Sequence, residues 1–122
     1  MKTTTQTQSP TTGGLRGLHA YQVSLEFYRQ LMAALQTAAR SHVTNQITRA
    51  SESVVLNIGE AYPATGNDRA RRFRIAADEA SECRVALDLL DIRKVLPERT
   101  TKELRALNDR QCAMLFRLSR RR

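Results

Sequence analysis

The feature that most constrains this chain is a repeat of apolar residues at alternating spacings of three and four, which recurs in four stretches. That spacing places the apolar side chains on one face of an α-helix. The predicted helices cover roughly 18–39, 42–62, 68–95 and 101–119. No stretch shows the period of two that marks a half-buried strand. The sequence therefore predicts an all-α protein, an antiparallel up-down four-helix bundle with short connections.

Each predicted helix has a starting signal and a buried face. Ser41 is placed to cap the second helix, and Asn67 or Asp68 the third. Thr100 and Glu103 have capping-box spacing at the start of the fourth. The predicted buried faces are Leu18, Tyr21, Leu25, Tyr28, Met32, Leu35 and Ala39; then Val43, Ile47, Ala50, Val54, Ile58 and Ala61; then Phe73, Ala76, Ala80, Cys83, Leu87 and Leu90; and finally Leu104, Leu107, Met114, Leu115 and Leu118.

A chain of 122 residues is long enough for one domain. We expect residues 1–17 to form a disordered N-terminal tail, because the polar start buries too little apolar surface to offset the entropy of ordering it. Residues 18–119 are expected to form the bundle, and residues 120–122 a basic C-terminal end. No export signal and no run of ~20 apolar residues is found. We therefore expect a cytoplasmic protein without a membrane partner.

The second half of the third helix carries a second apolar stripe, on another side from the first. This stripe consists of Val85, Leu89, Ile92 and Leu96. One stripe can face the core, so the other is left for an oligomer interface, because exposed apolar patches mark interfaces. The alternative is that the fourth helix wraps far enough to cover both stripes.

The formal charge of +8 comes almost entirely from arginine, with seventeen Arg against three Lys. One cluster at the start of the third helix consists of Arg69, Arg71, Arg72 and Arg74, and another near the C-terminus of Arg117, Arg120 and Arg121. Cations are unfavourable at a helix N-terminus, so the first cluster suggests an anionic partner such as RNA or DNA phosphates. The alternatives are pairing with Asp68, Asp78 or acids of other helices, and a basic composition without function. Few aromatic residues flank either cluster, so we expect phosphate contacts without base stacking.

Polar residues run beside the apolar stripe of the second helix. Gln46, Arg49, Ser53, Asn57 and Glu60 form this polar seam at helical spacing. A buried carboxylate needs a partner, so we expect Asn57 and Glu60 to bond across helices or subunits, with Arg49 or Arg84 as the partner of Glu60. The alternative is that both side chains face water at the edge of the stripe.

Residue patterns for catalysis are absent from the sequence. Neither His19 nor His42 follows a glutamate by three, so the di-metal motif of helical bundles is missing and no metal site or cofactor is expected. Glycine-rich phosphate loops and nucleophile–histidine sets are also missing. Cys83 and Cys112 are far apart and form no CxxC motif, so both are expected to be free buried thiols. The sequence indicates a nonenzymatic protein.

The segment NQITRASESVVLNIGEAY, from Asn45 to Tyr62, resembles the second helix of the small bacterial four-helix-bundle family named for intervening sequences in 23S ribosomal RNA genes. The segment FRIAADEASECRVALDLL, from Phe73 to Leu90, is similar to the third helix of that family, and the resemblance covers roughly 18–119. It implies a four-helix bundle assembled into a ring-like homopentamer. The family also resembles the accessory variability protein of diversity-generating retroelements. That resemblance implies nucleic acid and a reverse transcriptase as partners.

Two functions remain open at this point. One is a homo-oligomeric module that binds RNA or DNA phosphates through its arginine clusters. The resemblance implies that such a module could act as an accessory to a reverse transcriptase. The other is a protein-interaction scaffold without nucleic-acid binding. Their salt dependence separates them, because phosphate binding weakens steeply as salt rises.

Overall fold

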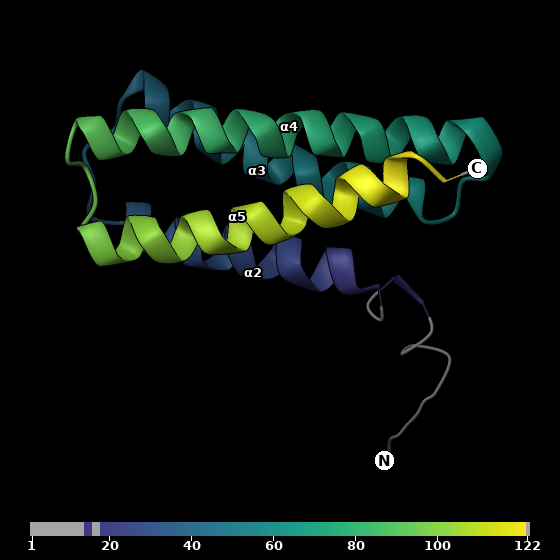
Figure 1. Cartoon of the computed structure of the whole chain (residues 1–122). Helices are drawn as coiled ribbons and strands as arrows, with labels where there is room; N and C mark the ends of the chain where they lie inside the picture. The colour runs from purple at the N-terminus through teal and green to yellow at the C-terminus, as the bar shows by residue number, and fades with distance from the viewer. Residues whose placement is uncertain (1–13, 16–17, 122) are drawn as a thin grey trace, which may run out of the picture.

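Four helices make up the computed structural model, which describes residues 14, 15 and 18–121 (Figure 1). They are α2 (His19–Leu35), α3 (His42–Ala61), α4 (Gly66–Ile92) and α5 (Glu98–Ser119). Helix α2 packs against α3 and α5, and α4 packs against the same two helices, so α2 and α4 lie diagonally opposite each other. No strand occurs among the described residues. The predicted antiparallel all-α bundle is confirmed.

The core consists of two apolar clusters along the bundle axis. One contains Phe27, Ile47, Leu87 and Leu104, and the other contains Val54, Phe73 and Leu115 among others. The predicted buried faces of α3 and α4 are confirmed, apart from Val43 at the start of α3, which is half-buried. Burial of these faces is the main stabilising contribution, at roughly 25 cal/mol per Å² of apolar surface.

The buried face predicted for the first helix is wrong. Helix α2 buries Ala20, Val23, Ser24, Phe27 and Leu31, whereas the predicted stripe from Leu18 to Leu35 is half-buried at the edge. Both sets have helical spacing, so periodicity alone cannot choose between them. The structure turns the face with the large Phe27 ring inward and leaves the tyrosine hydroxyls within reach of water.

The ends of the helices follow local chemistry, with some differences from the prediction. Ser41 caps α3 as predicted, since its Oγ accepts a hydrogen bond of 3.2 Å from the Thr44 N–H. Helix α4 begins earlier than predicted, with Thr65 at the N-cap position and Gly66 at φ 57°, a backbone conformation that favours glycine. Helix α5 begins at Glu98, so the predicted capping box of the fourth helix is not formed.

Leu96 is not part of the exposed stripe, contrary to the prediction. Helix α4 ends at Ile92, and Lys94 adopts a left-handed φ of 56°. The Val95 N–H then donates to the Leu90 carbonyl, a hydrogen bond of 3.0 Å typical of a Schellman end. This turn redirects the chain, so Leu96 is only 8% exposed and packs in the first core cluster.

Most of the predicted tail lies outside the described residues. Of the predicted tail, the structure describes residues 14 and 15, and Leu15 packs against the second core cluster. Residues 1–13, 16 and 17, and residue 122 of the predicted basic end, lie outside the described residues. Among the described residues, no helix combines the length and apolar character needed to cross a membrane.

Candidate nucleic-acid interface

The two arginine clusters meet at one end of the bundle. Helix α4 begins where α5 ends, because the two helices pack antiparallel (Figure 1). Arg69, in the first turn of α4, and Arg121, just after α5, line the same pocket of about 160 Å³. Clusters that are far apart in the sequence therefore form one surface. We call this end of the bundle the basic end, and we group with it the arginines in the first turns of α4 and at the end of α5 that form no ion pair among the residues that the structure describes: Arg69, Arg74, Arg117, Arg120 and Arg121.

A second pocket adjoins the first at the basic end. It measures about 180 Å³ and lies between the start of α2 and the end of α5. Arg121 lines both pockets, and Arg117 and His19 line the second. Arg110 extends the positive surface along α5, with its Nη2 3.4 Å from His19 Nε2. Side chains from three helices thus contribute to one positively charged region.

Ion pairs divide the first arginine cluster. Arg71 pairs with Asp68 at 3.1 Å, and Arg72 pairs with Glu60 of α3 at 2.6 Å. These two contacts are the structural pairing that the alternative explanation expects. Within the described part of the chain, none of the five arginines of the basic end has an acidic partner within 4 Å. Their charge is therefore available to an external anion.

Two arginines of the basic end lie over aromatic rings. The Arg69 guanidinium lies 5.7 Å from the centroid of Phe73, and that of Arg120 lies 5.2 Å from the centroid of Phe116. Such contacts contribute about 0.5–1 kcal/mol at exposed sites. They restrict the side chains without neutralising them, which lowers the entropy that phosphate binding would have to remove.

The local field at the start of α4 also favours an anion. The side chain of Thr65, at the N-cap position, makes no capping hydrogen bond, and the helix dipole is positive at this end. Two arginines without acidic partners, Arg69 and Arg74, lie in the first three turns. Cations are unfavourable at this end of a helix dipole, and an anion is favourable there.

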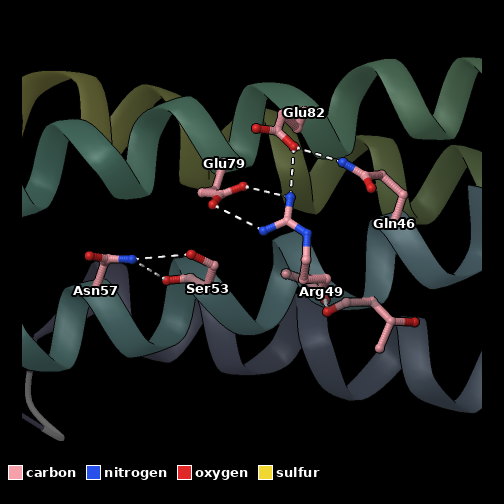
Figure 2. Close-up of polar contacts among 8 residues, drawn as sticks. Gln46, Arg49, Ser53, Asn57, Glu79 and Glu82 are labelled. Atoms are coloured by element: carbon pink, nitrogen blue, oxygen red, sulfur yellow. Dashed lines mark hydrogen bonds and ion pairs between the residues drawn. The ribbon is translucent and has the colours of Figure 1, made fainter.

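The polar seam forms a cross-helix network at its first two residues. Figure 2 shows Arg49 of α3 reaching toward Glu79 and Glu82 of α4, with distances of 3.4 and 3.0 Å. Gln46 donates a hydrogen bond of 3.1 Å to the same Glu82. The hydrogen bond to Glu79, whose side chain is only 15% exposed, raises the pKa of Arg49 above its usual value. This network links α3 to α4.

The rest of the seam behaves differently from the prediction. Asn57 donates within its own helix, to the Ser53 carbonyl at 2.9 Å and to Ser53 Oγ at 3.1 Å (Figure 2). Glu60 does bond across helices, but its partner is Arg72 and not the predicted Arg49 or Arg84. Helical spacing showed which residues share a side, whereas the choice of partner depended on how α4 lies against α3.

Three residues of the predicted α4 stripe are exposed. Val85, Leu89 and Ile92 are 59%, 44% and 75% exposed, so α5 does not cover both stripes, contrary to the alternative considered above. Val85 and Leu89 also line a pocket of about 340 Å³ between α3 and α4. We keep the name α4 stripe for Val85, Leu89 and Ile92.

Metal and thiol chemistry have little support in the described residues. Within them, no group of three or more His, Cys, Asp or Glu side chains could hold a metal ion. Cys83 is buried and free, and desolvation raises its pKa to about 12. Cys112 is also free, and partial burial raises its pKa. Neither thiol is prepared to act as a nucleophile, since the thiolate is the reactive form.

Comparison with known proteins decides the family. A family model described as 23S rRNA-intervening sequence protein matches residues 18–117. The chain belongs to this family. The match spans all four helices and confirms the resemblance carried by Asn45–Tyr62. Among the basic-end residues, Arg69, Arg74 and Arg117 lie inside the region matched to the 23S rRNA-intervening sequence proteins, whereas Arg120 and Arg121 lie beyond it.

The fold is shared with a solved structure. A protein of unknown function from the S23 ribosomal protein family of Bacteroides thetaiotaomicron aligns with a TM-score of 0.73 and 22% identity. The alignment covers 84% of this chain and 96% of that protein. No curated protein matches the chain. At 22% identity this similarity shows only that the 23S rRNA-intervening sequence protein described here has the same fold as that structure.

Proposed function

We propose that this chain is a nonenzymatic, homo-oligomeric module that binds nucleic-acid phosphates at the basic end. The observation that carries the proposal is the meeting of Arg69 and Arg121 at one pocket, with no acidic partner for either among the described residues. Two guanidinium groups without partners repel each other, and a phosphate oxygen between them removes that repulsion. The net charge of +8 adds long-range attraction for a polyanion.

Binding of this kind does not depend on nucleotide sequence. Arginine contacts to phosphates position a protein on nucleic acid but carry no sequence information. We therefore expect RNA and DNA of unrelated sequences to bind with similar affinity. Affinity should fall steeply as salt rises, because each neutralised phosphate releases counterions.

Self-association is the second part of the proposal. The exposed α4 stripe supports it, because monomeric proteins seldom leave such a ridge in water. We propose five copies, the number that the family resemblance implies. Light scattering would test this by comparing the particle mass with five times the chain mass of 13.8 kDa.

Fluorescence anisotropy with labelled RNA and DNA oligonucleotides tests phosphate binding. The site variant is Arg69→Gln with Arg121→Gln, and the matched control is Arg40→Gln with Lys102→Gln. The control removes the same charge from exposed basic residues that also lack an acidic partner among the described residues. We expect the site variant to lose at least tenfold in affinity and to show a shallower salt dependence, while the control stays near wild type.

Two results would overturn phosphate binding. One is a wild-type chain that fails to retain either nucleic acid at about 0.15 M salt. The other is an equal loss in the site variant and the control, because net charge alone would then explain binding.

The exposed apolar side chains favour a second candidate, a protein-interaction scaffold. Leu56 and Phe116 lie outside the α4 stripe and are 64% and 57% exposed. The scaffold would bind a partner protein, and the family resemblance implies a reverse transcriptase as that partner. Co-purification of a partner that withstands nuclease treatment and high salt, from a chain that does not bind oligonucleotides, would favour the scaffold.

A further inference from the structure

A second apolar surface lies on the bundle, between α2 and α3. Its centre is a groove of about 290 Å³ whose exposed wall is Leu56. We call it the α2–α3 groove, and it is lined by Leu25, Tyr28, Glu52, Val55 and Leu56. We propose that this groove receives the α4 stripe of a second copy of the chain. The inference rests on the self-association proposed above and identifies the surface that completes it.

The two surfaces cannot cover each other within one chain. Helices α2 and α4 are diagonal in the bundle, and the groove lies on the α2 side of α3. The α4 stripe lies on the other side of α3, where Val85 and Leu89 border the pocket between α3 and α4. Each copy therefore presents one apolar ridge and one apolar groove in different places, and only another chain can cover them.

The spacing of the stripe suits a groove between two helices. Val85, Leu89 and Ile92 are spaced by four and three, so they form a ridge on one helix that is about 10 Å long at 1.5 Å per residue. The groove lies between two helices, and ridges packing into grooves are the usual form of helix contact. Pairing the stripe of one copy with the stripe of another would leave the Leu56 wall in water.

The charges that flank the two surfaces also match. Glu52 accepts a hydrogen bond of 2.7 Å from the Tyr28 hydroxyl, which holds its carboxylate at the groove, and it has no cationic partner among the described residues. At the end of the stripe, Arg93 and Lys94 are exposed and have no acidic partner in the described part of the chain. A stripe seated in the groove brings cations toward this carboxylate.

A ridge-to-groove contact is heterologous, so every copy keeps one unused ridge and one unused groove until the assembly closes. This property gives a test that a symmetric stripe-to-stripe dimer would fail. Leu56→Glu damages only the groove, and Leu89→Glu damages only the stripe. A mixture of the two variants still contains one intact contact, between the groove of the stripe variant and the stripe of the groove variant.

Analytical ultracentrifugation of each variant and of their mixture tests the inference. We expect each variant alone to sediment as a monomer at concentrations where the wild type assembles, and the mixture to form a dimer that grows no further. The matched control is Phe116→Glu, which places the same charge at an exposed apolar residue outside both surfaces and should assemble like wild type. Circular dichroism of each variant shows whether the bundle is folded.

Several results would overturn the inference. If Leu56→Glu assembles like wild type, the groove is not the receiving surface, although self-association stands. If the mixture stays monomeric, the contact is not heterologous. A wild type that is monomeric at every concentration refutes self-association itself, whatever its oligonucleotide binding. Should a glutamate unfold the chain, Glu52→Arg and Arg93→Glu give a second test, because each should weaken assembly and their combination should restore it.

Discussion

Gln111 donates a hydrogen bond of 2.7 Å to Asn108 in the centre of the bundle, where both side chains are buried. Asn108 in turn donates to the Ala80 carbonyl of α4 at 3.1 Å. This chain of amides lies between the two apolar clusters and ties α5 to α4 at one level of the bundle. The remaining amide oxygen of Gln111 and the Ser24 hydroxyl have no hydrogen-bond partner among the described residues.

Substituting the two members of the amide pair should lower the free energy of unfolding by unequal amounts. Asn108→Ala should lower the free energy of unfolding by about 1–3 kcal/mol, because it removes the partner of Gln111 and leaves a cavity. Gln111→Leu should cost less, because the Asn108 oxygen that loses its donor replaces the unpaired Gln111 oxygen, and Asn108 stays bonded to α4. Urea unfolding of both variants measures the difference. An equal loss would contradict this account of the layer.

Leu96 should behave as a core residue and not as an interface residue. Leu96→Ala should lower the free energy of unfolding by roughly 2–4 kcal/mol, at every protein concentration, because it opens a cavity in the first cluster. Lys102→Ala, at an exposed position of α5, should change it by less than about 0.5 kcal/mol. Thermal unfolding over a range of concentrations would reveal an interface role instead, as a loss that grows on dilution.

Burial of Cys83 predicts a loss of stability in alkali. Desolvation raises the pKa of this thiol from 9.0 to about 12, so the folded state keeps its proton after the unfolded state has lost it. Below pH 9 this thiol does not lower the free energy of unfolding. As pH rises from 9 toward 12, it lowers that free energy by about 1.4 kcal/mol per pH unit. Cys83→Ala should flatten the pH dependence measured by urea unfolding between pH 8 and 10. Identical slopes in the variant and the wild type would rule out this contribution.

The Glu60–Arg72 pair should contribute little, despite its short distance. Both side chains are partly exposed, and ion pairs at the surface contribute about 0–1 kcal/mol. Glu60→Ala should therefore lower the melting temperature only slightly, and the effect should shrink further in high salt. Asp78→Ala is the control, since Asp78 forms no ion pair among the described residues. A large, salt-resistant loss would mean that Glu60 has a partner outside this chain.

Several features could be predicted because they depend on neighbours along the chain. The buried faces of α3 and α4 and the Ser41 cap are of this kind, since spacing and local hydrogen bonding determine them. The buried face of α2 was mistaken because two stripes of similar character compete on that helix. Asn108 and Gln111 were missed because polar residues at core positions give no apolar signal.

The sequence by itself determined the number of helices, the approximate position of their ends and the surplus of apolar surface on α4, all of which follow from local spacing and capping. Tertiary structure alone decided that Arg72 pairs with Glu60 of α3 and that Arg69 and Arg121 line one pocket, whereas the Arg71–Asp68 pair follows from a spacing of three within α4. It also decided that Leu96 is buried, through one left-handed residue after α4. The physical reason is that pairing and burial depend on how helices are placed beside one another, and no spacing along a single helix contains that information.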